Sequence, residues 1–418
     1  MMRYIALITG KCILFGLHLF GRRGAALPGL IVERLFPRFL ATSLNLLPEG
    51  VVVVTGTNGK TTSTKMLTHI LRADKKVLTN PTGSNFVRGI VATIIQHSTW
   101  GGKLPYDIGV FELDEAYAAL FVKQFKPRAT LVLNVMRDQM DRFGEIDHTA
   151  KLLTEVVKNT TQFVILNGDD DRVAAMKNHT KAAVFFFAVD SSLRDIFRTD
   201  DELHDGVTIQ GSKQVISAKL KKFDTKNQAT IVIDNQTIVA SLKAKGTYNA
   251  QNATAVALAA YLLETPVEVI TTRISEVVPA FGRGEHIKIG DKTVILQLVK
   301  NPGGFRHALL SGSQAKQSAT MIAINDNYAD GRDVSWLWDV QFHTGIEGEV
   351  ITAGSRAADM NLRLQYDDIN TAYSIQNLSK ALDTLLSIKG KTVLIYTTYT
   401  AMLELRQLLA KKTEVEVI

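Results

Sequence analysis

A run of four valines leads into a glycine-containing turn at residues 51–62, which read VVVVTGTNGKTT. The valines favour a buried strand, and Gly56 and Gly59 allow the backbone to close around an anion. The helical pattern that begins at Thr61 would direct its N-terminal N–H groups at that anion. The alternative is a turn with a purely structural role.

This segment predicts a nucleotide-phosphate site in which Lys60 neutralises the phosphates and the Thr61 hydroxyl binds Mg²⁺. It departs from the G-x-x-x-x-G-K-[ST] motif, because Val54 stands where the first glycine should be. The residues that we expect to contact the nucleotide are Thr57, Asn58, Gly59, Lys60, Thr61 and Thr62.

The composition is that of a large globular chain. With 418 residues, 46% hydrophobic and 21% charged, we expect two or three domains. The net charge of +7 is spread without a dense Lys/Arg tract, which favours a general attraction to anions over nucleic-acid binding. Cys12 is the only cysteine, so an intramolecular disulfide and a multi-cysteine zinc site are excluded. These features fit a reducing cytoplasm.

The N-terminal segment poses a separate question. Residues 5–20 are mostly apolar and are followed by Arg22 and Arg23, as in some anchor segments. Lys11 interrupts the run, which is shorter than the roughly 20 residues of a spanning helix. We favour an amphipathic helix packed on the first domain, and a helix on a membrane surface is the alternative.

Apolar strands alternate with helical patterns, as a parallel sheet covered by helices requires. In the first part of the chain we expect strands at 51–55, 108–112, 129–134 and 163–167, and helices near 62–71, 116–124 and 148–158. Residues 191–244 break into short polar-interrupted runs, which indicate a β-rich insert, and residues 246–263 return to a helix.

A second α/β domain is expected after a hinge near residues 279–284. Its strands should lie at 294–299, 320–325, 350–352 and 393–397, and its helices at 304–313, 357–364, 374–387 and 400–409. The predicted domains are a helical segment at 1–45, a central domain at 46–278 and a smaller domain at 284–418.

Polar clusters follow two of the expected strands, at the edge where open α/β sheets bind ligands. Glu112, Asp114 and Glu115 end one strand, and Mg²⁺ is usually held by one or two carboxylates with phosphate oxygens and water. Asp114 and Glu115 should matter less than Glu112 if they face solvent, and a solvated acidic loop is the alternative. The charged residues at 137–142 could belong to a ligand site or to a structural ion-pair network, and both interpretations stay open.

Five segments together resemble the Mur ligase superfamily. They are GTNGKTT at 56–62, ELDE at 112–115, Asn134 with RDQMDR at 137–142, GTYNAQNA at 246–253 and FGR at 281–283. The resemblance implies an α/β fold with a P-loop central domain, whose parallel sheet is flanked by helices, and a Rossmann-like C-terminal domain. Members of this superfamily form amide bonds with ATP by phosphorylating a substrate carboxylate, after which an amine attacks the acyl phosphate.

The same resemblance implies roles for single residues. Lys60 and Thr61 would contact phosphate and Mg²⁺, with Glu112 as a second metal ligand at the catalytic centre. Asn249 and Asn252 would lie on the adenine side, and Arg283 would reach the phosphates from the hinge. Without the family, the two asparagines fit a helix N-terminus equally well.

The C-terminal part narrows the resemblance. KNPGGF at 300–305 and NDNYADGRDVSWLWD at 325–339 are similar to the MurT family, the ligase-like subunits of lipid II isoglutaminyl synthases. This resemblance implies amidation of the α-carboxyl of D-glutamate in the lipid II stem peptide. Ammonia would come from a class I glutaminase partner, GatD. The second segment contains Asp326, which we expect at the nucleotide; a loop capped by Asp and anchored by Trp is the alternative.

An aspartate of this family's ligase subunit is thought to complete the partner's Cys-His pair. We expect Asp333 in this role, with Asp330 and Asp339 as alternates, because Trp336 and Trp338 flank the segment and aromatic residues commonly anchor interfaces. The chain itself should not hydrolyse glutamine. Its only cysteine is expected to be buried in an apolar helix, with a raised pKa.

Many MurT-like chains carry a four-cysteine zinc ribbon in the first domain, and this chain has no cysteine at 191–244. We therefore expect ATP and Mg²⁺ and no zinc. The expected location is the cytoplasm, and contact with the inner face of the membrane stays open. Two other classes also stay open: a stand-alone amino-acid-adding ligase of the Mur or folylpolyglutamate type, and a non-catalytic ATP-binding scaffold.

Overall fold

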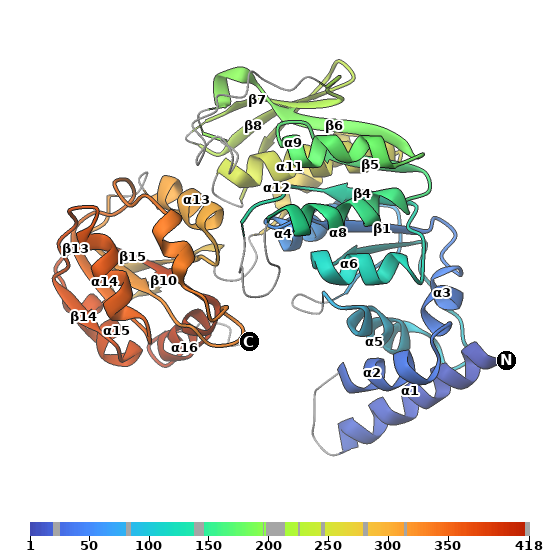
Figure 1. Cartoon of the computed structure of the whole chain (residues 1–418), viewed down its shortest axis with the longest axis horizontal. Helices are drawn as coiled ribbons and strands as arrows, with labels where there is room; N and C mark the ends of the chain where they lie inside the picture. The colour runs from blue at the N-terminus through green and yellow to red at the C-terminus, as the bar shows by residue number, and fades with distance from the viewer. Residues whose placement is uncertain are drawn as a thin grey trace. The chain divides into compact units, whose positions relative to one another are not determined.

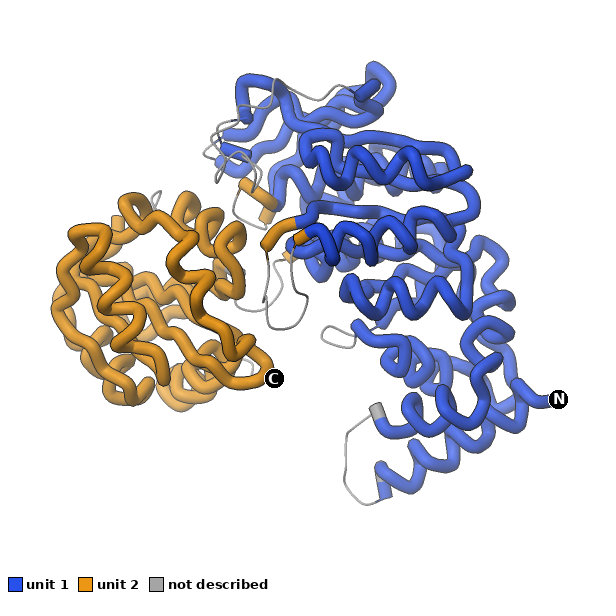
Figure 2. The backbone as a smooth tube through the Cα atoms, viewed as in Figure 1, with its two compact units in different colours: residues 1–135, 147–242, 249–277 blue, residues 136–146, 243–248, 278–418 orange. Residues whose placement is uncertain are grey.

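The computed structural model describes residues 1–19, 26–80, 85–137, 146–194, 196–197, 214–224, 226–243, 247–278, 283–312 and 316–413. The chain divides into two compact units (Figure 2). Unit 1 comprises residues 1–135, 147–242 and 249–277, and unit 2 comprises residues 136–146, 243–248 and 278–418. Residues 138–142, Gly246, Phe281 and Gly282 of the family segments lie outside the described residues.

Unit 1 is built on one large sheet with helices on its faces (Figure 1). Its described elements are α1 (Met2–Leu19), α2 (Ala26–Leu35), α3 (Phe39–Leu44), β1 (Val51–Thr55), α4 (Lys60–Leu71), β2 (Val77–Leu78), α5 (Val87–His97), β3 (Ile108–Glu112), α6 (Glu115–Val122), β4 (Ala129–Val132), α8 (Ile146–Lys158), β5 (Phe163–Asn167), α9 (Asp171–Ala175), η1 (Met176–His179), β6 (Ala183–Val189), η2 (Ser191–Leu193), β7 (Ala218–Phe223), β8 (Gln228–Ile233), β9 (Gln236–Ser241), α11 (Thr247–Leu262) and α12 (Val267–Glu276).

The strands β1 to β6 form the parallel part of this sheet. Among the described residues the sheet has nine strands in the order β2-β3-β1-β4-β5-β6-β7-β8-β9. The strand β1 pairs in parallel with both β3 and β4, and all five of its residues are buried. A parallel strand that is covered on both faces needs a continuous apolar run, which the four valines supply. The expected strands at 51–55, 108–112 and 163–167 are confirmed, and β4 ends at Val132.

The β-rich stretch extends the same sheet. The strand β7 pairs in parallel with β6, and β7, β8 and β9 then pair antiparallel. Asp234 and Asn235, with φ of 43° and 65°, form the turn between β8 and β9. Two successive residues with positive φ give a turn whose twist suits a tight hairpin. Residues 218–241 are thus part of the main sheet of unit 1.

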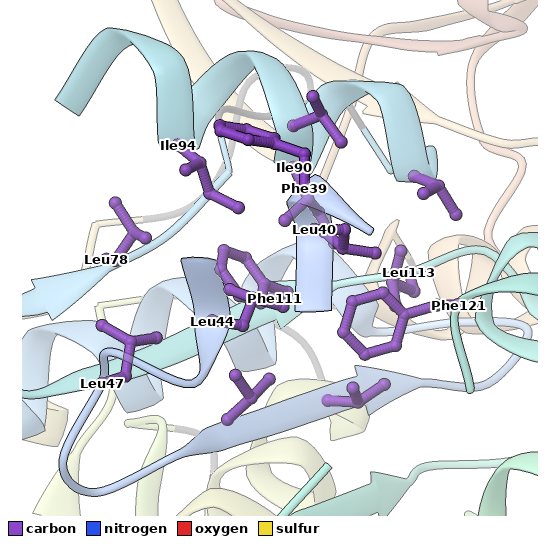
Figure 3. Close-up of a cluster of buried hydrophobic side chains, with 14 of the residues drawn as sticks. Phe39, Leu40, Leu44, Leu47, Leu78, Ile90, Ile94, Phe111, Leu113 and Phe121 are labelled. Atoms are coloured by element: carbon purple, nitrogen blue, oxygen red, sulfur yellow. The ribbon is translucent and has the colours of Figure 1, made fainter. Parts of the chain in front are cut away.

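The N-terminal helices pack on unit 1, as expected. The helix α1 contacts α2, α3 and α5, and its Ala6 and Leu7 are fully buried. Figure 3 shows the core that this region shares with the sheet, including Phe39 and Phe111. Cys12 was expected to be buried, and this is wrong: it is exposed, because it lies on the outward face of α1. No helix among the described residues has both the length and the apolar character needed to cross a bilayer.

Unit 2 has its own sheet and core. Its described elements are β10 (Arg283–Ile289), β11 (Lys292–Leu298), α13 (Pro302–Gly312), β12 (Ala319–Ala323), η3 (Ser335–Asp339), β13 (Glu349–Ala353), α14 (Ala357–Gln365), β14 (Tyr373–Ile375), α15 (Leu378–Ser387), β15 (Thr392–Thr397) and α16 (Tyr399–Ala410).

The sheet of unit 2 has six described strands in the order β10-β11-β15-β12-β13-β14. All neighbours pair in parallel except β10 and β11. The helix expected from residue 374 was placed too early. Residues 373–375 form β14 beside β13, and α15 begins at Leu378 with Asn377 as its N-cap. Strand pairing across the sheet decides the conformation here, which local sequence cannot show.

Candidate active site

The turn after β1 has the geometry of an anion-binding loop. Gly56 and Gly59 have φ of 121° and 88°, a region that residues with a Cβ rarely adopt. Gly59 is the N-cap of α4, so the first N–H groups of that helix are directed at the turn. A phosphate group bound there would meet backbone N–H donors and the positive end of the helix dipole.

Asn134 fixes the shape of this loop. Its carbonyl oxygen accepts from the N–H of Thr57 at 3.1 Å, and its Oδ1 accepts from the N–H of Asn58 at 2.8 Å. Its Nδ2 donates to the carbonyl oxygen of Asn58 at 3.1 Å. Asn134 follows β4, the neighbour of β1, so the loop is held by the adjacent strand end. The loop is therefore preorganised before any ligand binds.

Lys60 lies in a buried acidic environment. Its Nζ is 3.0 Å from Oε2 of Glu115 and 3.8 Å from Oδ1 of Asp114, and it donates to the carbonyl oxygen of Thr57 at 3.3 Å. The side chain of Glu115 is only 2% exposed. The expectation that Glu115 could face solvent is therefore wrong. The helix α6 carries it inward at its first residue, where Asp114 is the N-cap.

Thr61 and Glu112 bring two hard oxygen ligands together. The Thr61 hydroxyl donates to Oε1 of Glu112 at 2.9 Å. Asn80 fixes the backbone of Glu112, because its Nδ2 donates to the Glu112 carbonyl oxygen at 2.9 Å and its Oδ1 accepts from the Glu112 N–H at 3.0 Å. No group of three or more acidic, histidine or cysteine side chains that could hold a metal occurs among the described residues. A hydroxyl and one carboxylate suit Mg²⁺ that completes its shell with phosphate and water.

The helix α11 completes the loop from a distant part of the chain. A Cβ at Gly59 would lie 2.5 Å from Oδ1 of Asn252, so the asparagine side chain packs directly on the loop glycine. Asn252 is 5% exposed, and its Nδ2 is buried with no hydrogen-bond partner in the described chain. Asn249 is also buried and lies one turn earlier on α11. An unused buried donor beside a glycine cradle fits a bound polar ligand such as a nucleotide.

The aspartates predicted at residues 325–339 belong to unit 2, and Asp330 lies where the loops after β12 and β15 meet. Asp330 accepts from the N–H of Thr400 at 2.7 Å and from the N–H of Asn327 at 3.2 Å, and also pairs with the Thr400 hydroxyl. Burial raises the pKa of Asp330, which is 3% exposed. This carboxylate thus holds two loops and the start of α16, which favours a structural role.

The other three aspartates have different surroundings. Asp326 accepts from the Ser355 hydroxyl at 2.7 Å and from Nε of Arg356 at 2.9 Å, and these partners hold its pKa below the usual range. Asp339 is exposed, 3.9 Å from the guanidinium of Arg137. Asp333 is half-buried and accepts from the N–H of Ser335 at 2.8 Å within its own turn.

The two tryptophans beside these aspartates differ in burial. Trp336 is 7% exposed and packs near Phe305 in the core of unit 2, so its expected place at an interface is wrong. Trp338 is 50% exposed, and its ring centroid lies 5.1 Å from that of Tyr366, which is also exposed. Trp338 is therefore available for contact with a partner, whereas Trp336 fixes the segment to the core of unit 2.

Sequence reasoning missed the roles of Asn134, Asn80 and Glu115. Asn134 is the first residue with a polar side chain after β4, which was the available signal. Asn80 and Glu115 gave none, because only the fold shows that they meet Glu112 and Lys60. Arg283 begins β10, and its side chain lies outside the described part of the structure.

Comparison with known families places both units. The family model described as Mur ligase middle domain matches residues 54–260, and the one described as MurT ligase C-terminal matches residues 298–402. The MurT subunit of lipid II isoglutaminyl synthase (glutamine-hydrolyzing) from Streptococcus pneumoniae is 32% identical over 444 residues, across 98% of this chain and 97% of the relative. The corresponding subunit from Staphylococcus aureus strain COL is 28% identical over 92% of this chain and 93% of its own.

Solved structures with low identity share the fold. MurF from Acinetobacter baumannii superimposes with a TM-score of 0.70 at 17% identity, over 92% of this chain and 80% of that chain. The MurF ligase from Thermotoga maritima in complex with ADP gives a TM-score of 0.69 at 15% identity, over 91% and 85%. With its α/β fold of the Mur ligase type and its full-length similarity to MurT subunits, the chain belongs to the MurT family of the Mur ligase superfamily.

Proposed function

We propose that this chain is the ATP-dependent ligase subunit of a lipid II isoglutaminyl synthase. It would convert the α-carboxyl of D-glutamate in the lipid II stem peptide to an amide, which gives D-isoglutamine. One observation carries the proposal: the hydrogen-bonded pair of Thr61 and Glu112, with Lys60 next to Thr61 in sequence, occurs in a chain similar over 98% of its length to a MurT subunit.

The reaction would proceed in two transfers. A carboxylate oxygen of the substrate attacks the γ-phosphorus of ATP, and ADP leaves. Ammonia then attacks the acyl carbon, phosphate leaves with its bonding electron pair, and the nitrogen loses a proton. Lys60 and the N–H groups at the start of α4 would offset the charge on the transferred phosphoryl group. Bound through Thr61 and Glu112, Mg²⁺ would neutralise phosphate charge.

The proposal includes four further residues that were predicted to contact the nucleotide. Asn249 and Asn252 stay predicted contacts on the adenine side, and the side chain of Asn252 packs on Gly59 of the anion-binding loop. Arg283 and Asp326 stay predicted contacts of the nucleotide. We assign the central ATP-binding domain to residues 46–278 and the C-terminal domain to residues 284–418.

The first test supplies ammonium, ATP and lipid II to the purified chain. ADP release with formation of the amidated stem peptide is expected. Lys60→Ala should lower turnover at least about 100-fold, by analogy with losing one transition-state donor at about 3 kcal/mol. Lys65→Ala, an exposed lysine on the same helix, is the matched control. Turnover only with an amino acid would indicate a stand-alone ligase, and no ADP with any carboxylate acceptor would indicate a scaffold.

We also propose that a GatD-like class I glutaminase supplies the ammonia and that Asp333 completes its Cys-His pair. An aspartate so placed orients the imidazole and stabilises its charged form. Two observations support this choice of residue. Asp330 is committed to an internal network, whereas Asp333 is half-buried and lies in the segment that exposes Trp338.

The reconstituted complex tests the role of Asp333. Asp333→Asn should abolish glutamine-driven amidation and leave ammonium-driven amidation intact, and Asp359→Asn on the exposed face of α14 is the control. Equal loss of both activities would assign Asp333 to the ligase site. Because lipid II is anchored in a membrane, we further propose that the chain acts in the cytoplasm at the inner membrane face.

A further inference from the structure

We infer that the outward face of α1 is a docking surface for an anionic lipid bilayer. The inward face is fixed by packing: Ala6 and Leu7 are fully buried, and a Cβ at Gly10 would lie 2.6 Å from Cδ1 of Ile95 on α5. On the outward face of α1, five side chains follow one another at intervals of three or four residues and so lie along one side of the helix. We call this set the α1 stripe; it consists of Ile5, Ile8, Cys12, Phe15 and Leu19.

The α1 stripe carries no charged side chain, and it is exposed except at Ile8, which is half-buried. Ile5, Phe15 and Leu19 are 43%, 61% and 71% exposed, and Cys12 is exposed as well. A continuous apolar face along a helix of 18 residues, about 27 Å long, is unusual on a protein surface that meets only water. Such a face marks contact with a membrane or another protein.

The side chains beside the stripe favour a membrane. Trp100 and Tyr4 are 56% and 47% exposed, and aromatic residues of this kind concentrate at membrane interfaces. Nζ of Lys11 lies 5.2 Å from the centre of the Trp100 ring, and Lys103 is exposed in the same turn. Lys11 itself is only 9% exposed, whereas the exposed Lys103 can keep its charge near lipid headgroups while its methylenes cover apolar surface.

The net positive charge of the N-terminal segment favours binding to an anionic membrane over a neutral one. Residues 1–47 contain six arginine and lysine residues and one acidic residue, Glu33. Basic segments are attracted to the negative headgroups of a cytoplasmic leaflet. The helix would lie in the plane of the interface with its stripe among the headgroups and upper acyl chains. Membrane binding would bring the chain close to a lipid-linked substrate, and this advantage rests on the proposed function. The inference that the α1 stripe binds a membrane does not depend on that function.

The single cysteine provides a direct test. Cys12 of the full chain is labelled with a polarity-sensitive fluorophore and mixed with vesicles of phosphatidylcholine containing phosphatidylglycerol. We expect a blue shift of the emission and sedimentation of the unlabelled chain with these vesicles, and neither with phosphatidylcholine alone. Phe15→Ser with Leu19→Ser should weaken vesicle binding at least about fivefold, because the stripe loses its largest exposed apolar groups.

The control replaces two exposed side chains in unit 2, Leu362→Ser on α14 with Tyr366→Ser at the C-cap of that helix, and should leave vesicle binding unchanged. Ammonium-driven turnover of a water-soluble stem-peptide analogue should be unchanged in the Phe15 and Leu19 variant, which shows that it is folded. An unshifted Cys12 probe with anionic vesicles would overturn the inference. So would a shift that depends on protein concentration without vesicles, which would make the stripe a self-association face. Failure of all amidation with intact vesicle binding would overturn the proposed function alone.

Discussion

Lys60 and Glu115 form an ion pair that is nearly inaccessible to water, with side chains 9% and 2% exposed. Removing one partner of such a pair leaves a buried charge without compensation, which typically costs about 3–5 kcal/mol. We expect Glu115→Gln to lower the free energy of unfolding by about 3 kcal/mol and Asp114→Asn, whose carboxylate is farther from Lys60, to lower it less.

A double-mutant cycle in urea measures this coupling. Lys60→Met combined with Glu115→Gln should recover most of the stability lost in Glu115→Gln, because no charge is then left buried alone. Strictly additive losses in the double variant would show that the two side chains do not stabilise each other.

Glu112 supplies the carboxylate of the proposed Mg²⁺ site. Deleting one hard oxygen ligand leaves the ion held by phosphates and Thr61, so Glu112→Ala should raise the Mg²⁺ concentration for half-maximal ATP turnover at least about tenfold. Magnesium titrations of Glu112→Ala and Asp114→Ala provide the comparison. A titration unchanged in Glu112→Ala but shifted in Asp114→Ala would move the ligand role to Asp114.

His307 links the stability of α13 to pH. The ring is buried near that of Tyr248, and burial, followed by the charge of Arg306, lowers its pKa to about 4. Because the pKa is lower in the folded state than the ordinary value of 6.5, the unfolded state binds the proton more readily. The stabilising contribution is therefore complete above about pH 6.5 and is lost as the pH falls towards about 4.

The expected loss is about 2 kcal/mol between about pH 7 and about pH 5. Urea unfolding followed through Trp336, which is buried in unit 2, measures it at both pH values. His307→Gln should flatten this dependence, and His343→Gln, at an exposed site, should not. Equal pH slopes in the wild type and His307→Gln would rule out His307 as the source.

At the scale of elements, strands buried on both faces were predictable and elements defined by pairing were not. The strands β1, β3 and β5 are fully buried and mainly apolar, and their predicted bounds are those of the structure. The strand β14 has three residues and exists because it pairs with β13. Hydrophobic runs report burial directly, whereas pairing partners come from elsewhere in the chain.

Some helices were likewise predicted from the sequence and others were not. The helix α4 follows from its phosphate loop, but α5 and α12 were not predicted. Thr61 and Glu112, which were predicted to share a metal ion, lie within hydrogen-bond distance of each other, and their role as metal ligands stays a prediction. The buried state of Glu115 and the exposure of Cys12 could not be predicted, because each depends on which face of a helix the rest of unit 1 covers.

At the scale of the molecule, the part of unit 2 after residue 283 has a sheet and a hydrophobic core of its own. All six described strands of its sheet and both of its hydrophobic clusters lie in residues 283–413. We expect residues 283–418 expressed alone to unfold in one cooperative thermal transition, followed by circular dichroism and Trp336 fluorescence. A gradual, non-cooperative loss of signal would contradict this.

Phe305→Ala provides the matched variant for the isolated fragment. Phe305 is fully buried and its ring contacts those of Trp336, Phe342 and Tyr396. Truncating it should cost about 3–5 kcal/mol, enough to abolish or strongly weaken the transition of a domain of this size.

The contact between Gly59 and Asn252 has a consequence for synthesis on the ribosome. The phosphate loop emerges early, but the helix that closes it lies almost 200 residues later and is translated tens of seconds afterwards at about 5–20 residues per second. A nascent chain that ends before residue 247 would therefore carry Lys60 and Thr61 without the surface that completes their site. If the loop binds nucleotide, we expect binding only to nascent chains that extend beyond α11, which binding assays on stalled chains of different lengths would measure.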